Sequence, residues 1–121
     1  MSRKEFFNLY APAAMDHQVK YGIPASVTLA QMALESTWGT SDLARFGNNF
    51  FGIKATTSWL SQNLPYSIHD DDYLSEKFCN FSSPLESMEY HSKILMSNRY
   101  RRCWNFGPTD YHNWLVEIKA A

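Results

Sequence analysis

The chain has 121 residues, of which 45% are hydrophobic and 16% aromatic, and its formal net charge is −1. This length and composition predict one folded domain and exclude a disordered chain. The near-neutral charge argues against a partner held by electrostatic attraction, such as nucleic acid or an anionic membrane, and no apolar run is long enough to span a bilayer. The high aromatic share indicates that some rings line a cleft or binding face.

Two helices are predicted first. Residues 3–21 have helical spacing, and Pro12 predicts that this helix has two parts, the second beginning near the proline. Gly22 is expected to end it in a left-handed cap. The next helix begins near Pro24 and stops at Gly39. It is apolar around much of its circumference, which predicts a central position.

A small lobe is expected to follow. Thr40 or Ser41 can cap a short helix, which the turn-forming sequence "FGNNFFG" ends. From residue 55 to residue 81 helical periodicity is lost, and "YSIH" and "EKFCNF" are candidate strands of a hairpin. The interpretation for this segment is an irregular lobe that carries a short β-hairpin.

Two more helices complete the chain. Ser83, Pro84 and Glu86 have the spacing of a capping box at a helix N-terminus. Thr109 is expected to cap the last helix, whose inner stripe is predicted to be Tyr111, Leu115 and Ile118. The predicted fold class is mainly α (α+β), with a small β-hairpin lobe between two helical halves.

The two cysteines, Cys79 and Cys103, have a spacing that matches no metal-binding motif. They could form a disulfide in an oxidising compartment or remain two buried thiols. We favour two unpaired thiols.

Glu35 is a carboxylate within an otherwise apolar helix, in the last turn before Gly39. The negative end of the helix dipole disfavours an ionised carboxylate there. Trp38, with Phe50 or Phe51, is expected to add desolvation, which also favours the protonated form. A protonated glutamate is the general acid that a glycosidase needs. From the local pattern alone, a solvated glutamate at a helix end is the favoured interpretation, because carboxylates are common at helix ends.

The segment "IPASVTLAQMALESTWGTSDLARFGNNFFGIKA" resembles the glucosaminidase domains of glycoside hydrolase family 73, the peptidoglycan N-acetylglucosaminidases. Their signature is an A-x-x-A-L-E-S-x-W-G helix followed by S-x-L-A and N-N-x-F-G-I-K. The later "FSSPLESMEYHSKILMSNRY" resembles a second family block, in which Tyr90 stands where members often have an acid. The resemblance extends from about Phe6 onward and implies a lysozyme-like helical domain.

Carried over residue by residue, the resemblance makes Glu35 the catalytic general acid. It also implies a cleft floor and substrate-binding residues beside the acid, with Trp38 chiefly packing against and orienting it. These residues are Trp38, Asn48, Asn49, Phe51 and Gly52.

The second carboxylate that the resemblance implies falls in "HDDDY", residues 69–73. Asp72 aligns best and is the candidate base or electrostatic stabiliser, while Asp70 and Asp71 stay open because the hairpin register decides which side chains face the cleft. Asp71 and Tyr73 are candidate substrate contacts. A plain charged turn is an equal alternative, and a metal site is a weaker one because adjacent strand residues point to opposite faces.

Two further expectations concern His91 and the end of the chain. His91 is expected to be a hydrogen-bonded core histidine rather than a catalytic one. Members of the family usually continue beyond the last helix, whereas this chain ends at Ala121. Residues 1–121 are therefore expected to be one glucosaminidase-like catalytic domain without the usual C-terminal segment.

By this resemblance, the chain is expected to cleave the β-1,4 bond after N-acetylglucosamine in peptidoglycan glycan strands. We expect a monomer that needs no metal ion and no organic cofactor and works in the periplasm or at the cell wall, although no export signal is visible. The alternatives are a muramidase or lytic transglycosylase, or a catalytically weak peptidoglycan-binding domain.

Overall fold

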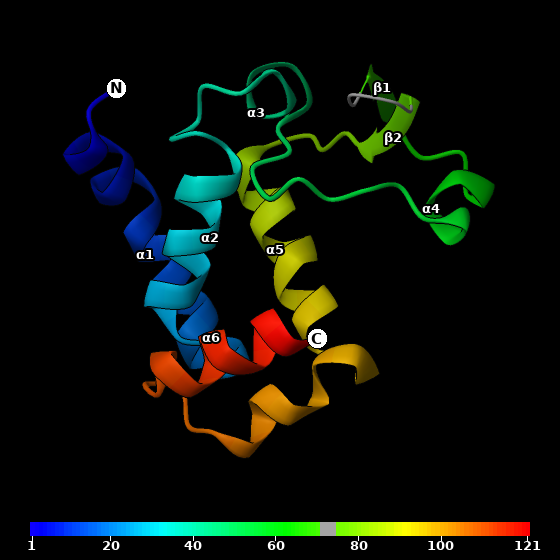
Figure 1. Cartoon of the computed structure of the whole chain (residues 1–121). Helices are drawn as coiled ribbons and strands as arrows, with labels where there is room; N and C mark the ends of the chain where they lie inside the picture. Colours follow the sequence, from blue (N-terminus) through cyan, green and yellow to red (C-terminus); the bar gives the residue numbers. More distant parts are fainter. Residues whose placement is uncertain (71–74) are drawn as a thin grey trace.

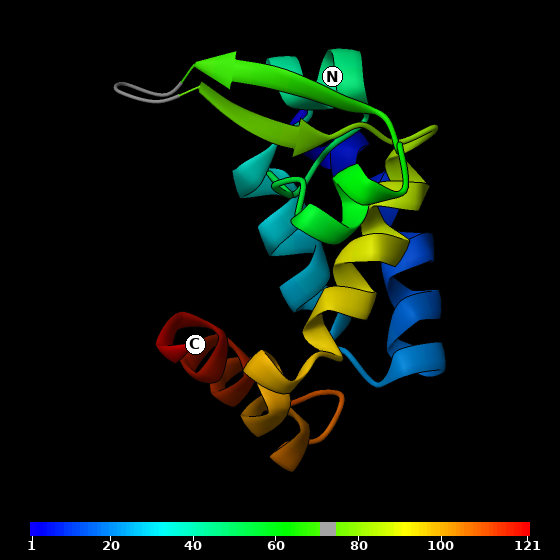
Figure 2. The same ribbon diagram turned by 90° about the vertical axis from the view of Figure 1, so that its right-hand side faces the viewer.

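The computed structural model describes residues 1–70 and 75–121, and the regular elements of this part of the chain are helices and one antiparallel hairpin. Three helices, α1, α2 and α5, lie side by side, with α6 at one end and the hairpin and α4 at the other (Figure 1, Figure 2). The elements are α1 (Arg3–Tyr21), α2 (Ala25–Glu35), α3 (Asp42–Gly47), α4 (Thr57–Ser61), β1 (Tyr66–Asp70), β2 (Ser75–Cys79), α5 (Pro84–Leu95), the 3-10 helix η1 (Asn98–Asn105) and α6 (Tyr111–Ala120). The predicted fold class, mainly α with a small hairpin lobe, is confirmed. No helix among the described residues is long and apolar enough to cross a membrane.

Helix α1 is one continuous helix, so the predicted division at Pro12 is wrong. Ser2 caps its start by accepting a hydrogen bond from the Glu5 amide, and Gly22 ends it with a φ of +80°, as predicted. Pro12 is exposed, and the buried face continues past it with Phe6, Tyr10 and Ala14. Packing of this stripe holds the helix together through the position where the proline removes a backbone bond.

The N-termini of α5 and α6 are held by polar side chains, though not all in the predicted way. Ser83 accepts from the Glu86 amide, as the capping box requires. The Glu86 carboxylate accepts from the amide and hydroxyl of Ser82 instead of from Ser83. Asp110, rather than Thr109, caps α6. The α6 stripe also differs from the prediction, because the face that packs inward consists of Trp114 and Ile118.

The lobe contains a short helix, α4, which the sequence analysis did not predict. Thr56 caps it by accepting from the Trp59 amide, and one turn is too short to show a periodic pattern. Trp59 is buried and its indole N–H donates to the Pro65 carbonyl at 2.9 Å. Its ring also packs edge-on against Phe81 and Tyr90. These contacts attach the lobe to α5.

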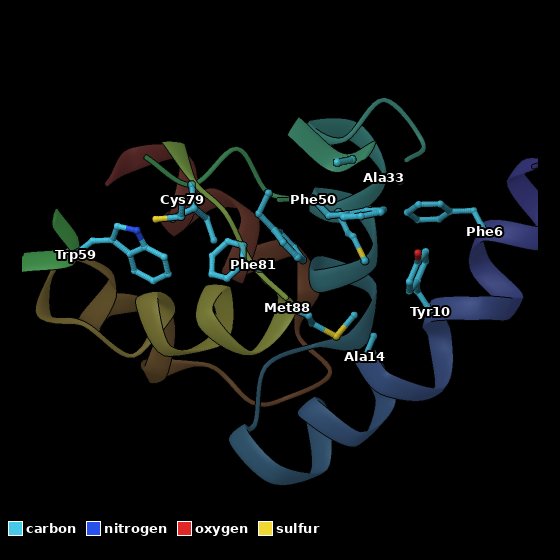
Figure 3. Packing of buried hydrophobic residues seen from close by; sticks show 13 residues of the cluster. Phe6, Tyr10, Ala14, Ala33, Phe50, Trp59, Cys79, Phe81 and Met88 are labelled. Atoms are coloured by element: carbon cyan, nitrogen blue, oxygen red, sulfur yellow. The ribbon is translucent and has the colours of Figure 1, made fainter. Parts of the chain in front are cut away.

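Two hydrophobic clusters form the core. The larger one extends from Trp59 and Phe81 on the lobe side to Phe6 and Tyr10 of α1 (Figure 3). The smaller one joins α2 and α5 to η1 and α6, and its buried members are Ile23, Val27, Leu95, Cys103 and Trp114.

The cysteines belong to different clusters, Cys79 to the larger and Cys103 to the smaller. Both are buried free thiols, so the preference for unpaired cysteines is confirmed. Burial raises the pKa of the Cys79 thiol to about 11, which keeps it protonated and unreactive at neutral pH.

Candidate active site

Helix α2 ends at Glu35, four residues before the predicted stop. The buried hydroxyl of Ser36 donates to the Met32 carbonyl at 2.6 Å and accepts from the Gly39 amide at 2.8 Å. Gly39 has a φ of +81°, a conformation that glycine adopts without strain. The turn presents Glu35 as an exposed side chain at the end of the helix. The expectation that aromatic neighbours enclose this carboxylate is therefore wrong.

Trp38 belongs to the turn that follows Glu35. Its backbone is left-handed, with a φ of +55°, and its amide donates to the Ala33 carbonyl. The ring packs edge-on against Phe6 and Phe7, with centroids 5.5 and 5.3 Å away. Trp38 therefore lies against α1, and it is not among the residues lining the cavity described below. Its contacts fit a packing role, and its assignment as a substrate-binding residue stays a prediction.

Asn49 organises the loop that follows α3. Its side chain is 1% exposed, and its Nδ2 donates to the carbonyls of Ile53 and Cys79, both at 2.9 Å. Its Oδ1 accepts from the amides of Ile53 and Phe51. Both donors and both acceptor positions are thus used inside the protein. Asn49 shapes the loop from within, and a direct contact with a ligand would require these bonds to break.

Asn48 and Gly52 position the loop that follows α3, Asn48 by a contact with Phe81 and Gly52 by its close approach to Glu35. Asn48 ends α3 with a left-handed backbone, and its Nδ2 donates to the Phe81 carbonyl at 3.1 Å. Gly52 has a φ of +64°, and a Cβ placed on it would stand 3.4 Å from Oε2 of Glu35. The loop consequently lies directly beside the Glu35 carboxylate.

A cavity of about 320 Å³ opens between α2, the loop, α5 and η1. It brings together two of the predicted site residues, Glu35 and Phe51, with Gly52 alongside. Asn48 and Asn49 support it without lining it. The lining residues are Gln31, Glu35, Phe51, Ile53, Lys54, His91, Ile94 and Tyr100.

Four polar residues of this lining were not predicted to lie at the site. Gln31 precedes Glu35 by four positions, so helical spacing alone could have placed both on one face. Lys54, His91 and Tyr100 lie in the two blocks that carry the family resemblance. Their convergence on one cavity depends on how α5 and η1 pack against α2, which is not visible in the sequence.

His91 is buried, as predicted, and also lines the cavity. It is 9% exposed and its ring stacks on Phe51, with centroids 4.1 Å apart and an interplanar angle of 17°. Burial, with a smaller contribution from His17, lowers the pKa of His91 to about 4, so the ring is neutral at neutral pH. The expected hydrogen bond is missing at Nδ1, which has no partner among the described residues.

The lobe reaches the cavity through Lys54. Its Nζ lies 3.0 Å from Oε2 of Glu76 on β2, in an ion pair that the sequence analysis did not anticipate. The Cys79 amide also donates to the Ile53 carbonyl, which holds the loop against the same strand. These contacts fix the hairpin beside the cavity, with Glu76 as a β2 carboxylate near its edge.

The candidates for the second acid cannot be placed in this geometry. Asp71, Asp72 and Tyr73 lie outside the described residues. Asp70 is the last residue of β1 and pairs with Ser75 in the hairpin register. Among the described residues, no group of three His, Cys, Asp or Glu side chains is arranged to hold a metal ion. Because Asp72 lies outside the described residues, its role as the second acid stays a prediction.

Comparison with known proteins decides the family. The glucosaminidase family model, described as mannosyl-glycoprotein endo-beta-N-acetylglucosaminidase, matches residues 11–121. The chain belongs to this glucosaminidase family. The membership expected from the Glu35 segment is confirmed. The family match runs from within α1 to the end of the chain and includes every described residue of the cavity.

Two curated relatives support the assignment to the glucosaminidase family. The exo-glucosaminidase LytG of Bacillus subtilis is 32% identical over 82 residues, covering 64% of this chain and 28% of the relative. The peptidoglycan hydrolase FlgJ of Salmonella typhimurium is 34% identical over 86 residues, covering 64% and 27%. The matched part is thus less than a third of either relative's length.

Solved structures of two similar proteins have the same fold. The glycoside hydrolase domain of Salmonella typhimurium FlgJ superposes with a TM-score of 0.74 and 28% identity, covering 99% of this chain and 76% of that domain. The catalytic domain of the autolysin Auto from Listeria monocytogenes gives a TM-score of 0.75 and 30% identity, covering 95% and 71%. The expected lysozyme-like glucosaminidase fold is thereby confirmed.

Proposed function

We propose that the chain hydrolyses peptidoglycan at the β-1,4 bond after N-acetylglucosamine, with Glu35 as the general acid. The single observation that carries this proposal is the position of Glu35 within the family fold. It is exposed at the end of α2 and faces a cavity of about 320 Å³, with Gly52 close beside its carboxylate. Two relatives, the exo-glucosaminidase LytG and the peptidoglycan hydrolase FlgJ, have names that agree with this chemistry.

The exposure of Glu35 suits a proton donor whose environment changes when substrate binds. Sugar rings that enter the cavity cover the carboxyl group and displace water from it. The protonated carboxyl group of Glu35 then transfers its proton to the glycosidic oxygen as the C–O bond breaks. A water molecule then adds to the anomeric carbon and gives up a proton, either to the second carboxylate or back to Glu35, which completes hydrolysis.

We keep Asp72 as the proposed second carboxylate, with Asp70 and Asp71 as alternatives, and the substrate's acetamido group as the other possible assistant. Asp71 and Tyr73 remain proposed substrate contacts, as do Phe51 and Gly52 at the cavity. Glu76 is a less suitable candidate because its carboxylate is already held in an ion pair with Lys54.

Substitution of Glu35 tests the general-acid assignment. Glu35→Gln keeps the size of the side chain and removes the transferable proton. Lysis of purified peptidoglycan, followed by turbidity, is expected to fall about 10²- to 10⁴-fold, while co-sedimentation of the protein with the glycan is retained. A parent chain that sediments with peptidoglycan yet lyses it no faster than Glu35→Gln would indicate a glycan-binding domain instead.

The proposed substrate also sets the place of action. Peptidoglycan lies outside the cytoplasmic membrane, so the chain is proposed to work in the periplasm or at the cell wall. We further propose a monomer that acts without a metal ion or cofactor and does not bind nucleic acid. Gel filtration tests the monomeric state, and lysis in the presence of EDTA tests the independence from metal ions. Loss of lysis in EDTA contradicts the metal-free proposal.

A further inference from the structure

Two residues lining the Glu35 cavity carry a buried polar atom without a hydrogen-bond partner. The atoms are Oε1 of Gln31 and Nδ1 of His91. In the described part of the chain only one other side-chain atom shares this property, Oγ1 of Thr28, which lies outside the cavity lining. Buried polar atoms are nearly always paired, because an unpaired one destabilises the fold. Their concentration at one cavity indicates that a ligand supplies the missing partners.

The two groups can hydrogen-bond but carry no charge. Burial lowers the pKa of His91 to about 4, so its ring has one N–H donor and one acceptor nitrogen at neutral pH. The stacking on Phe51 holds the plane of that ring. Gln31 is half-buried and its amide offers a carbonyl acceptor and an NH₂ donor. A neutral ligand with both a donor and an acceptor matches this pair better than an anion does.

Three of the other lining residues are apolar, and Glu35, Lys54 and Tyr100 complete the lining. Phe51 and Ile53 are 7% and 9% exposed, and Ile94 is half-buried beside them. An acetamido group has three parts, namely an N–H donor, a carbonyl acceptor and a methyl group. The cavity offers an acceptor, a donor and an apolar wall in the same space, with Glu35 in its lining.

We propose that Gln31 and His91 form the subsite for the acetamido group of the sugar next to Glu35. The Gln31 carbonyl accepts from the acetamido N–H, and the His91 ring donates from Nδ1 to the acetamido carbonyl oxygen. The methyl group packs against Phe51, Ile53 and Ile94. This inference rests on the proposed function and assigns both residues to substrate specificity rather than to proton transfer.

The test compares one substrate with and without its acetamido groups. Purified peptidoglycan, the same material after de-N-acetylation, and that material re-acetylated with acetic anhydride are digested by each variant. The parent chain is expected to prefer the acetylated forms. Gln31→Met and His91→Phe should each reduce that preference roughly three- to ten-fold, the effect of one ordinary hydrogen bond. His91→Gln, which keeps a donor, should restore part of it.

Thr28→Val is the matched control. It removes the other unpaired buried atom, from the same helix as Gln31 but outside the cavity lining, and should leave the preference unchanged. Circular dichroism confirms that each variant folds. If Gln31→Met and His91→Phe slow both substrates equally and keep the parent's preference, the two residues only support packing and the inference is overturned.

A binding measurement separates this inference from the proposed function. Glu35→Gln is titrated with N-acetylglucosamine or with glucosamine, and the side-chain NMR signals of Gln31 and His91 are followed. N-acetylglucosamine alone should shift both signals, whether or not the parent chain lyses peptidoglycan. Equal shifts with both sugars, or none at these two residues, contradict the acetamido subsite. A parent no more active than Glu35→Gln contradicts the proposed function instead.

Discussion

At the scale of single residues, the site depends on side chains that support the cavity without lining it. Glu35 and the loop from Asn48 to Gly52 could be located from the sequence because their motif is contiguous. The exposure of Glu35 is what the local pattern alone favoured, whereas the left-handed backbone of Trp38 and the packing of its indole against α1 could not be predicted. Nor could the cavity position of His91, because that follows from packing of α5 on α2.

Asn49 gives the sharpest stability prediction at this scale. Asn49→Ala leaves the Ile53 and Cys79 carbonyls and two buried amides without their side-chain partner. We expect the free energy of unfolding to fall by about 3–4 kcal/mol, measured by urea denaturation. Asn48→Gly is the matched control, because it keeps the left-handed backbone and removes one hydrogen bond, at about 1 kcal/mol. Equal losses would contradict the central role of Asn49.

At the scale of elements, the sequence predicted the helices and the hairpin where several signals agreed. Ser41, Ser83 and Gly22 have the expected capping geometry. The errors arose where tertiary packing overrides a local signal or where an element is too short to give one. Pro12 suggested a break that the buried stripe of α1 overrides, and the single turn of α4 had no periodicity to detect.

The continuity of α1 makes a prediction for Pro12→Ala. Alanine restores the backbone N–H and removes the proline ring from a helix interior, so the free energy of unfolding should rise by roughly 1–3 kcal/mol. Thermal unfolding followed by circular dichroism measures the change as a higher Tm. Asp16→Ala, an exposed substitution on the same helix, should change stability far less. A Tm that is unchanged or lower in Pro12→Ala would show that the proline is fully accommodated.

At the scale of the whole molecule, α2 and α5 connect the two hydrophobic clusters and also line the cavity. The same two helices therefore contribute to the core and to the shape of the cavity, and His91 on α5 belongs to the cavity lining. The resemblance was enough to predict the family and the overall fold. It could not predict which residues other than Glu35 and Phe51 meet at the cavity, because most of them come from separate elements.

His91 predicts a pH dependence of stability. Its pKa of about 4 in the folded protein lies below the ordinary value of 6.5, so the unfolded chain takes up the proton first as the pH falls. The contribution of His91 to the free energy of unfolding is fully present above about pH 6.5. It falls by on the order of 3 kcal/mol as the pH drops toward about 4. Urea denaturation at several pH values should show a steeper loss in the parent than in His91→Phe. Parallel curves for the two proteins would contradict the burial of a neutral imidazole.

The central claim, that this chain is a peptidoglycan glucosaminidase, is tested most directly by mass spectrometry of the fragments it releases from purified peptidoglycan. Borohydride reduction before the measurement marks the sugar at each new reducing end. The account predicts reduced N-acetylglucosamine at those ends, and none above background with Glu35→Gln. Reduced N-acetylmuramic acid would indicate a muramidase, and anhydromuramyl ends a lytic transglycosylase; either result would contradict the account.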